Sequence, residues 1–247
     1  MEKVLVENNA DGTTLITINR AERRNAICND TAFLLQKAFV EFERSATQRA
    51  AVITGAGNEA FSGGADTGTF PELWRCIPTV GFETNKPIIS AVGGWCVGGA
   101  LVLSMMCDLT VAADNARFSY PEARLGFTGG IIAGLAARIP HKVAMELMLL
   151  CRVVDAQRAF NVGLVNEVVP VGQQVPVALK MAREMADFSP LVMKTLKRFV
   201  TEGVLAQGPS EQSGRAQRVL TEVKESEYAE EAWRAVKEKR KADFRGR

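Results

Sequence analysis

Two glycine-rich segments, each directly after a short apolar run, stand out in the first half of this sequence. Residues 51–54 lead into a glycine-rich segment at 55–68, and residues 88–92 lead into another at 93–100. An apolar run of this length followed by glycine is typical of a buried strand, and the apolar run at 100–107 is typical of a buried helix. A chain with such strand–turn–helix units is predicted to fold as a mixed α/β domain.

Neither glycine-rich turn carries a nucleotide-binding signature. The pattern GxxxxGK[ST] is absent, which excludes a P-loop, and GxGxxG is absent too. Glycine lets backbone N–H groups approach a ligand atom closely, and a helix N-terminus adds unpaired N–H donors. Two such turns could aim one N–H each at the same oxygen and form an oxyanion hole. The alternative is two tight turns that only pack helices against strands.

The composition excludes several classes of protein. With 247 residues, 47% hydrophobic and 23% charged, the chain has the composition of a globular protein with one large domain, or one domain and an appendage. The net charge of +2 argues against a dedicated nucleic-acid or membrane-surface protein. Five cysteines without a CxxC pair and the single histidine, His141, predict reduced thiols and no metal site. A Ser-His-Asp triad would have to use His141.

One stretch is long enough to cross a membrane. Residues 87–107 contain no charged side chain. Gly93, Gly94, Gly98 and Gly99 interrupt this stretch, so a buried strand, turn and helix in a soluble core is the better interpretation. The first residues lead straight into a strand-like run without a targeting segment. We therefore expect a cytoplasmic protein without a membrane partner.

One acid stands in the largely apolar segment at 118–126. This residue, Glu122, directly follows a proline. A carboxylate in apolar surroundings tends to have a raised pKa, which suits proton transfer. The alternative is a surface acid in a loop.

The N-terminal part offers two local predictions. Residues 8–12 are typical of a hairpin turn between two short strands. The apolar spacing at 30–44 predicts a helix, which Asn29 or Asp30 is expected to cap.

After Pro170 the pattern becomes wholly helical. The helices are expected at residues 175–187, 190–204 and 213–241. The sequence therefore predicts a mixed α/β core at 1–190 and a helical region at 191–247. Residues 233–247 carry seven basic and two acidic side chains, a local net charge of +5. Such a run is either a solvated helical tail or a segment that meets an anion.

A series of short segments occurs in an order that resembles the crotonase family, the enoyl-CoA hydratase/isomerase superfamily. The segments are NRAERRNA (19–26), ITG (53–55), FSGGAD (61–66), KPIISAVGG (86–94), GG (98–99), MCD (106–108), Phe118, PE (121–122), LG (125–126), GLVNEVV (163–169) and EKRKADF (238–244). The likeness covers essentially the whole chain. It implies an α/β fold built as a spiral of ββα repeats, with a C-terminal helical region that mediates oligomerisation.

The resemblance also implies an acyl-CoA site. Gly63 and Gly99 match the two N–H donors that would hold the thioester oxygen of an acyl-CoA while an enolate forms. Gly64, Ala65 and Asp66 match the loop that lines the CoA site.

Two basic residues match CoA contacts of the family. Arg24 lies where members often place a basic group near the CoA phosphates. Lys239 matches a lysine that approaches the nucleotide end of CoA, often from a neighbouring subunit, which would give the basic segment at 233–247 its anion. The resemblance implies a homotrimer or a dimer of trimers, and no cofactor, because coenzyme A is part of the substrate. No DNA partner is expected.

The second catalytic acid of the hydratases is missing. Those enzymes use two glutamates, and Glu122 matches the one that serves the α-carbon. The other would fall where this chain has Val102, which cannot activate water. The remaining glutamate suits the transfer of a proton from C2 to C4 or back, so the resemblance favours isomerisation of 3-enoyl-CoA to 2-enoyl-CoA.

Three alternatives remain open. A hydratase or dehydratase could recruit water through Tyr120 or Glu83. An acyl-CoA decarboxylase or hydrolase would need the oxyanion hole more than the glutamate. A non-catalytic scaffold could bind RNA through the basic segment.

The acyl pocket also departs from the family pattern. The segment between Asp66 and Pro87 is shorter than in typical hydratases, and residues 127–134 lack the usual Pro-Gly run. These changes would suit a bulky, branched or cyclic acyl group.

Overall fold

The computed structural model describes residues 2–66, 68, 71–205 and 207–245. It begins with the expected hairpin, in which β1 (Val4–Asn8) pairs antiparallel with β2 (Thr13–Ile18). The Asp11 carboxylate closes the turn by accepting hydrogen bonds from the backbone N–H of Thr13 at 3.1 Å and from its hydroxyl at 2.7 Å. Gly12 follows with a φ of +82°, a conformation that favours glycine.

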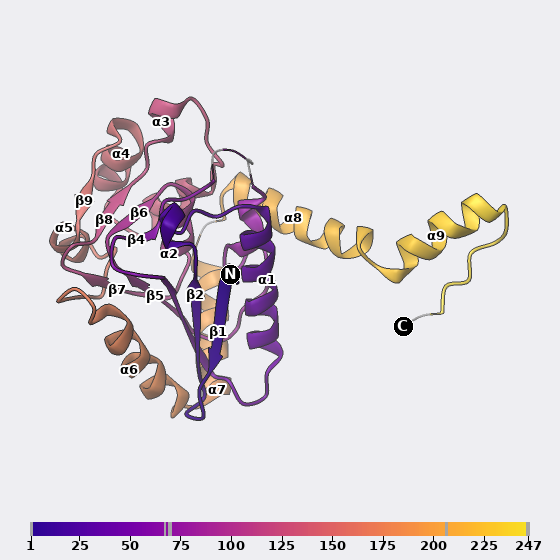
Figure 1. Cartoon of the computed structure of the whole chain (residues 1–247), viewed down its shortest axis with the longest axis horizontal. Helices are drawn as coiled ribbons and strands as arrows, with labels where there is room; N and C mark the ends of the chain where they lie inside the picture. Colours follow the sequence, from indigo (N-terminus) through magenta and orange to yellow (C-terminus); the bar gives the residue numbers. More distant parts are fainter. Residues whose placement is uncertain (1, 67, 69–70, 206, 246–247) are drawn as a thin grey trace.

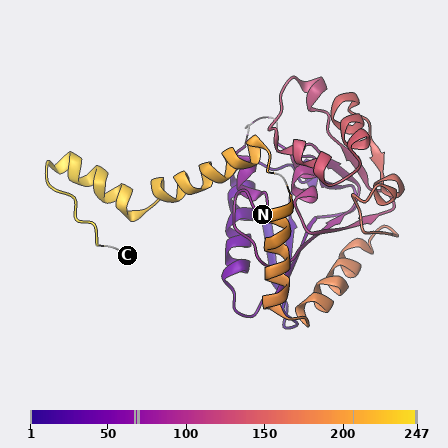
Figure 2. The same cartoon turned by 180° about the vertical axis from the view of Figure 1, so that it is seen from behind.

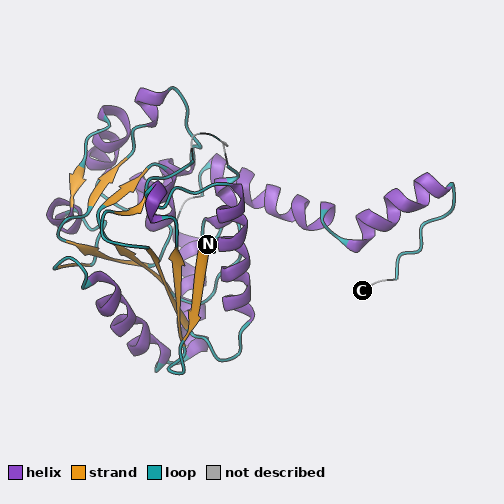
Figure 3. Cartoon of the chain, viewed as in Figure 1, coloured by secondary structure: helices purple, strands orange, loops and turns teal. Residues whose placement is uncertain are grey.

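Two sheets, of six and four strands, form the body of the described chain (Figure 3). The larger sheet has the order β1-β2-β3-β5-β7-β10, and the smaller has the order β4-β6-β8-β9. The bounds of the other strands are β3 (Ala50–Gly55), β4 (Ala60–Ser62), β5 (Ile88–Val92), β6 (Trp95–Val97), β7 (Leu109–Ala113), β8 (Arg117–Ser119), β9 (Val154–Asp155) and β10 (Glu167–Val169). Neighbouring strands run parallel, except in the pairs β1–β2 and β8–β9.

The chain alternates between the two sheets. Strand β3 lies in the larger sheet and β4 in the smaller, β5 and β6 repeat this step before helix α2 (Gly99–Met105), and β7 and β8 repeat it before the short helix α3 (Glu122–Leu125). Each strand–strand–helix repeat therefore adds one strand to each sheet. The rest of the repeat is the long connection that two neighbouring parallel strands need. The expected mixed α/β fold with repeated strand–strand–helix units is confirmed.

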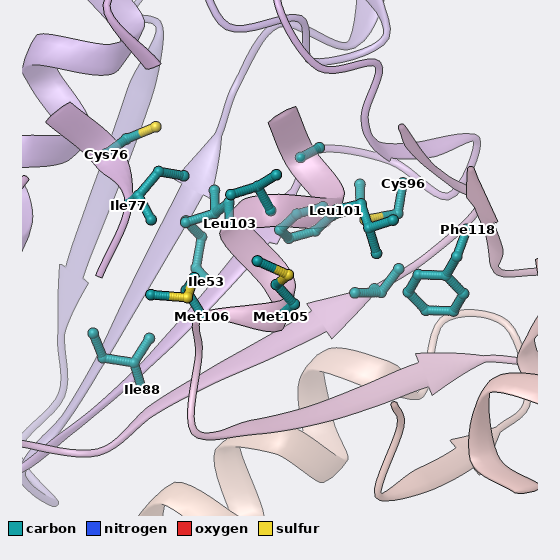
Figure 4. Packing of buried hydrophobic residues seen from close by; sticks show 14 of the residues in the cluster. Ile53, Cys76, Ile77, Ile88, Cys96, Leu101, Leu103, Met105, Met106 and Phe118 are labelled. Atoms are coloured by element: carbon teal, nitrogen blue, oxygen red, sulfur yellow. The ribbon is translucent and has the colours of Figure 1, made fainter. Parts of the chain in front are cut away.

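The main core lies among the sheets and helices α1 (Asn29–Arg44) and α2, and Figure 4 shows part of it. Leu35 and Phe39 of α1 are fully buried one helical turn apart, which places both on the core-facing side. The Phe39 ring stacks on Phe82 with centroids 4.6 Å apart.

The expected cap of α1 is wrong. The N-cap position is Cys28, and its side chain makes no capping hydrogen bond. The two predicted capping side chains are used elsewhere: Asn29 accepts a hydrogen bond from the backbone N–H of Glu72 at 2.9 Å, and Asp30 pairs with Lys3.

A second apolar layer covers the other face of the larger sheet. Ala178 and Ala182 of α6 (Gln174–Ala186) are fully buried against a group that includes Val52 and Ile89. Alanine at this spacing lets the helix backbone approach the sheet closely, and Figure 1 shows α6 along this face. The other helical segments of the core are η1 (Ala21–Arg23), η2 (Leu73–Cys76), η3 (Ile131–Ala137), α4 (His141–Leu150) and α5 (Ala156–Asn161).

The C-terminal region is helical, as expected, with two differences in detail. Helix α7 (Pro190–Arg198) passes into a π-helical segment, η4 (Phe199–Val204), where one continuous helix was predicted. The predicted helix at 213–241 is two helices, α8 (Pro209–Lys224) and α9 (Glu227–Glu238). The break has a local cause, because the Ser226 hydroxyl caps the new helix by accepting the N–H of Ala229. The division of the chain at residue 190 stays a prediction.

The uncharged stretch at 87–107 folds inside the core. It supplies β5, β6 and the seven-residue helix α2. Among the described residues, no helix combines the length and the apolar character that a membrane span requires.

Candidate active site

The first glycine-rich turn is held by backbone hydrogen bonds to the segment after η1. The Gly63 N–H donates to the Arg24 carbonyl at 2.8 Å, the Ile27 N–H donates to the Gly64 carbonyl at 2.8 Å, and the Asp66 N–H donates to the Ile27 carbonyl at 2.9 Å. Residues that lie far away in the sequence therefore hold the backbone of this turn in place.

The two glycine-rich turns are in direct contact. Gly64 has a φ of +85°, and a Cβ placed on it would lie 2.5 Å from the Val97 carbonyl oxygen and 3.3 Å from the Gly99 nitrogen. No side chain fits at this position, so glycine is required there. The predicted meeting of the two turns is therefore present in the fold.

Glu122 lies against the second turn. A Cβ on Gly98, whose φ is +57°, would lie 2.5 Å from Oε1 of Glu122. The Gly98 N–H donates to the Ser119 carbonyl at 2.9 Å, which joins this turn to the strand that leads to Glu122. The carboxylate therefore rests on the backbone at the start of α2.

Glu122 is buried and incompletely satisfied. The residue is 7% exposed, and its Oε2 has no hydrogen-bond partner among the described residues. Burial raises the pKa of Glu122 from its ordinary value of 4.5 to about 7. The alternative of a surface acid is wrong, and the expected apolar surroundings are present. A carboxyl group with this pKa can both accept and return a proton near neutral pH.

The hydrogen bonds do not support Gly63 as an N–H donor to a ligand. Its N–H already donates to Arg24, whereas the N–H groups of Ala65 and Gly99 have no acceptor among the described residues. Gly99 is the first residue of α2, where N–H groups lack intrahelical partners. In this arrangement Ala65, rather than Gly63, is the candidate for the first donor.

Apolar side chains flank the second turn. Val102 is one helical turn after Gly98 in α2 and is 7% exposed. A Cβ on Gly99 would lie 2.5 Å from Cδ1 of Leu73, so Leu73 of η2 rests against the same backbone. No acid other than Glu122 appears in these contacts.

Comparison with known proteins shows the family of this chain. The family described as enoyl-CoA hydratase/isomerase matches residues 8–247. The chain belongs to this family. A carnitinyl-CoA hydratase from Mycobacterium avium is similar, with 32% identity over 100% of both chains and a TM-score of 0.77. A probable enoyl-CoA hydratase/isomerase from Mycobacterium abscessus has 33% identity over 100% of both chains and a TM-score of 0.76. An enoyl-CoA hydratase from Mycobacterium tuberculosis H37Rv has 29% identity over 99% of both chains and a TM-score of 0.76.

The two proposed substitutes for the second hydratase acid lie in different places. Tyr120 is buried near Glu122, and its hydroxyl forms a 2.7 Å hydrogen bond with Thr128. Burial raises the pKa of Tyr120, and the nearby Glu122 charge adds to this. Glu83 is exposed and pairs with Arg218 of α8 at 3.0 Å.

Asp66 is held in an ion-pair cluster. It pairs with Arg20 at 3.1 Å and with Arg23 at 3.5 Å. The hydrogen bond from Arg20 keeps the pKa of Asp66 below its ordinary value. Sequence reasoning missed Arg20, which also donates to the Ala26 carbonyl and so ties the segment after η1 to the first turn.

The two predicted CoA contacts lie on opposite parts of the molecule. Arg24 is exposed beside the first turn, with a φ of +50°. Lys239 ends α9, which extends away from the body together with α8 (Figures 1 and 2). The structure therefore brings Arg24, but not Lys239, near the Glu122 site of the same chain.

No metal centre is found in the described part of the chain, where no three His, Cys, Asp or Glu side chains come together as ligands. The five cysteines form no disulfide, and only Cys107 is partly exposed.

Proposed function

We propose that this member of the enoyl-CoA hydratase/isomerase family is an acyl-CoA isomerase that converts 3-enoyl-CoA into 2-enoyl-CoA, with Glu122 as its single acid and base. The buried Glu122 carboxylate, with its pKa of about 7 and its unpartnered Oε2, is the observation that carries the proposal. The group is poised to change protonation state near neutral pH.

The proposed reaction conserves the proton. The Glu122 carboxylate takes a proton from C2 of the 3-enoyl thioester, and the electron pair moves onto the thioester oxygen. The N–H groups of Ala65 and Gly99 stabilise this oxyanion, and each such donor typically contributes a few kcal/mol. Protonated Glu122 then gives the proton to C4, and the double bond moves from C3–C4 to C2–C3.

The apolar neighbours support isomerisation over hydration. Val102 and Leu73 lie beside the second turn, and neither can activate a water molecule. Apolar side chains beside the site would keep water from protonating a dienolate intermediate, which leaves the proton transfer to Glu122.

Hydration or dehydration is the second candidate. The related structures carry names such as carnitinyl-CoA hydratase and enoyl-CoA hydratase. For this chain the reaction would require another group to bind water, and Tyr120 is the nearby residue with a hydroxyl.

The proposed CoA contacts are Arg24, together with Gly64, Ala65 and Asp66 of the first turn. In our proposal Lys239 reaches the CoA of a neighbouring subunit in a homotrimer or dimer of trimers. The enzyme would act in the cytoplasm and need no cofactor besides the coenzyme A that the substrate carries.

The substitution Glu122→Gln tests the proposal. It should lower the kcat for double-bond migration in 3-hexenoyl-CoA by about 10²–10⁴-fold, the usual contribution of a general acid–base group. Binding of CoA esters should survive. The control is Glu184→Gln, which alters an exposed acid of α6. Turnover retained in Glu122→Gln would contradict the proposal, and hydration of crotonyl-CoA as fast as isomerisation would favour the second candidate.

A further inference from the structure

A cavity of ≈ 410 Å³ lies between the core and the C-terminal helices, apart from the Glu122 site. Its lining includes Arg138, which follows η3, Lys197 of α7, and Glu211 and Arg215 of α8. A second hollow of ≈ 430 Å³ shares Arg215 and two threonines with it, so the two hollows are neighbours at that arginine.

Unsatisfied polar atoms gather at these two hollows. Among the described residues, four buried side-chain atoms lack a hydrogen-bond partner, and one of them is Oε2 of Glu122. The other three are Oε1 of Glu211, Nε of Arg215 and one terminal nitrogen of Arg218, and all three residues line the hollows. Buried polar groups are normally paired because leaving them unpaired is costly. Within the described chain, these three atoms lack hydrogen-bond partners as Oε2 of Glu122 does, and a second ligand site is the simplest reason for this.

The charges around the cavity leave a positive excess. Lys197 is neutralised by Asp108 at 2.7 Å, and Arg218 by Glu83 at 3.0 Å.

Arg138 donates to the Gly134 carbonyl at 2.7 Å and to the Met106 sulfur at 3.1 Å, so neither of these bonds supplies a negative charge. Nε of Arg215 has no hydrogen-bond partner among the described residues, and Glu211 is the acid whose charge interacts with this arginine. Burial raises the pKa of Glu211, and the charges of Arg138 and Arg215 partly offset this. Because Asp108 pairs with Lys197, Glu211 is the one acid of the described lining left to face two arginines, so a positive charge remains.

Apolar side chains make up one part of the lining, beside polar ones such as Thr110, Asn166 and Thr201. Ile139, Leu164 and Leu196 all border the cavity. Ile139 is buried, whereas Leu196 is largely exposed, so the apolar part reaches from the core to the surface. A water molecule could fill part of such a space, but it cannot neutralise the Arg215 guanidinium. The volume lies in the range of small-molecule pockets, roughly 300–1,000 Å³.

We propose that this cavity binds a monocarboxylate with an apolar tail, with its carboxylate on Arg215 and its tail along Ile139, Leu164 and Leu196. A guanidinium is the side chain best suited to a carboxylate, because its N–H groups match the two oxygens. The apolar lining distinguishes this ligand from a bare inorganic anion. The site is separate from the proposed reaction and does not depend on it.

Isothermal titration of the full-length protein with octanoate tests the proposal. Octanoate should bind saturably, with one site per chain, whereas 1-octanol and acetate should each bind at least about tenfold more weakly. The substitution Arg215→Gln should weaken octanoate binding by about tenfold or more, because a hydrogen bond to a charged group contributes about 1.5–3 kcal/mol. Lys224→Gln is the matched control, since it removes an exposed positive charge from the same helix.

Two further variants show whether octanoate binds in this cavity or at the Glu122 site. Leu164→Phe should fill the apolar part and weaken octanoate binding while the protein stays folded. Glu122→Gln should bind octanoate as the unaltered chain does, since Glu122 belongs to the other site. The proposal is overturned if Arg215→Gln keeps its affinity, or if octanol binds as tightly as octanoate. It is also overturned if Arg215→Gln only changes the oligomer mass, because Arg215 would then meet a second copy of the chain.

Discussion

At the scale of single residues, Glu122 is the group whose surroundings decide its chemistry. Its Oε1 lies on the backbone of Gly98, its Oε2 has no partner among the described residues, and burial raises its pKa to about 7. The same burial that lets this carboxyl group carry a proton near neutral pH also makes its ionised form destabilise the folded state.

The raised pKa of Glu122 predicts a pH dependence of activity. Only the ionised carboxylate can take the proton from C2, so kcat/KM should rise with pH through about 7 and then level off. A pH profile with 3-hexenoyl-CoA checks this. A profile that is flat from pH 5 to pH 9 would show that this group does not limit the reaction.

The same pKa predicts a pH dependence of stability. The folded state holds the Glu122 proton more tightly than the unfolded state, so the free energy of unfolding should fall as pH rises from about 4.5 to about 7. Glu122→Gln should lack this loss, which by pH 8 amounts to about 3 kcal/mol for a shift from 4.5 to about 7 at roughly 1.4 kcal/mol per pKa unit. Urea unfolding at pH 5 and pH 8 measures the difference, and an equal change in both proteins would contradict it.

Val102 is the residue that we expect to separate isomerisation from hydration. Val102→Glu places an acid one helical turn from Gly98, where it could activate water. Hydration of crotonyl-CoA should rise by about 10²-fold or more, the usual effect of a general acid–base group. Val102→Gln is the control, because it has the same shape without the acid. Equal rates in the two variants would show that an acid at this position is not sufficient.

At the scale of elements, the two glycine-rich turns hold the site together through close backbone contacts. Gly64 lies so close to the Val97 carbonyl oxygen that no Cβ fits there, whereas Gly98 touches the Glu122 carboxylate, which a Cβ would displace. These contacts position the backbone of both turns, and that backbone carries the free N–H groups of the site.

Gly98→Ala should therefore damage the site. The substitution puts a Cβ into a backbone with a φ of 57° and a ψ of -119°, a strained combination for any residue but glycine that costs roughly 1–3 kcal/mol, and it pushes the Glu122 carboxylate away. Isomerase activity should fall by about 10²-fold, the effect of a displacement near 1 Å. The control is Gly172→Ala, where φ is +88° but no atom lies within 4 Å of the new Cβ. A similar loss in the control would assign the effect to backbone strain alone.

At the scale of the whole molecule, the C-terminal helices form an arm. Helix α8 leaves the body and α9 continues away from it in both views (Figures 1 and 2). Trp233 and Val236 of α9 are 76% and 71% exposed, which is unusual for apolar side chains on one short helix. This is the arrangement expected of a segment that contacts a neighbouring subunit.

Trp233→Asp tests the role of the arm. If α9 docks on a neighbour and presents Lys239 to its CoA, the variant should form smaller assemblies and show a KM raised by about tenfold, with kcat less affected. Light scattering after gel filtration and steady-state kinetics measure the two effects. Lys237→Gln, at an exposed position of the same helix, is the control. A monomeric unaltered chain, or an unchanged mass in Trp233→Asp, would contradict this role.

The N-terminal hairpin, strands β3 and β5, the two glycine-rich turns and the lack of a second acid at Val102 could all be predicted from the sequence. The smaller sheet (β4-β6-β8-β9) and the burial of Glu122 could not. The features that could be predicted depend on local composition and on the order of short motifs. Both are properties of residues that are adjacent in the sequence. The helical nature of the C-terminal region followed in the same way, from apolar spacing.

Which N–H groups stay free depends on contacts between segments that are distant in the sequence. The Gly63 N–H is used because Arg24, far away in sequence, supplies its carbonyl as acceptor, and this leaves Ala65 and Gly99. Likewise, nothing in the sequence around Arg215 shows that its Nε lacks a hydrogen-bond partner among the described residues. Hydrogen bonding and burial depend on which distant segments meet, and a pattern of neighbouring residues does not contain that information.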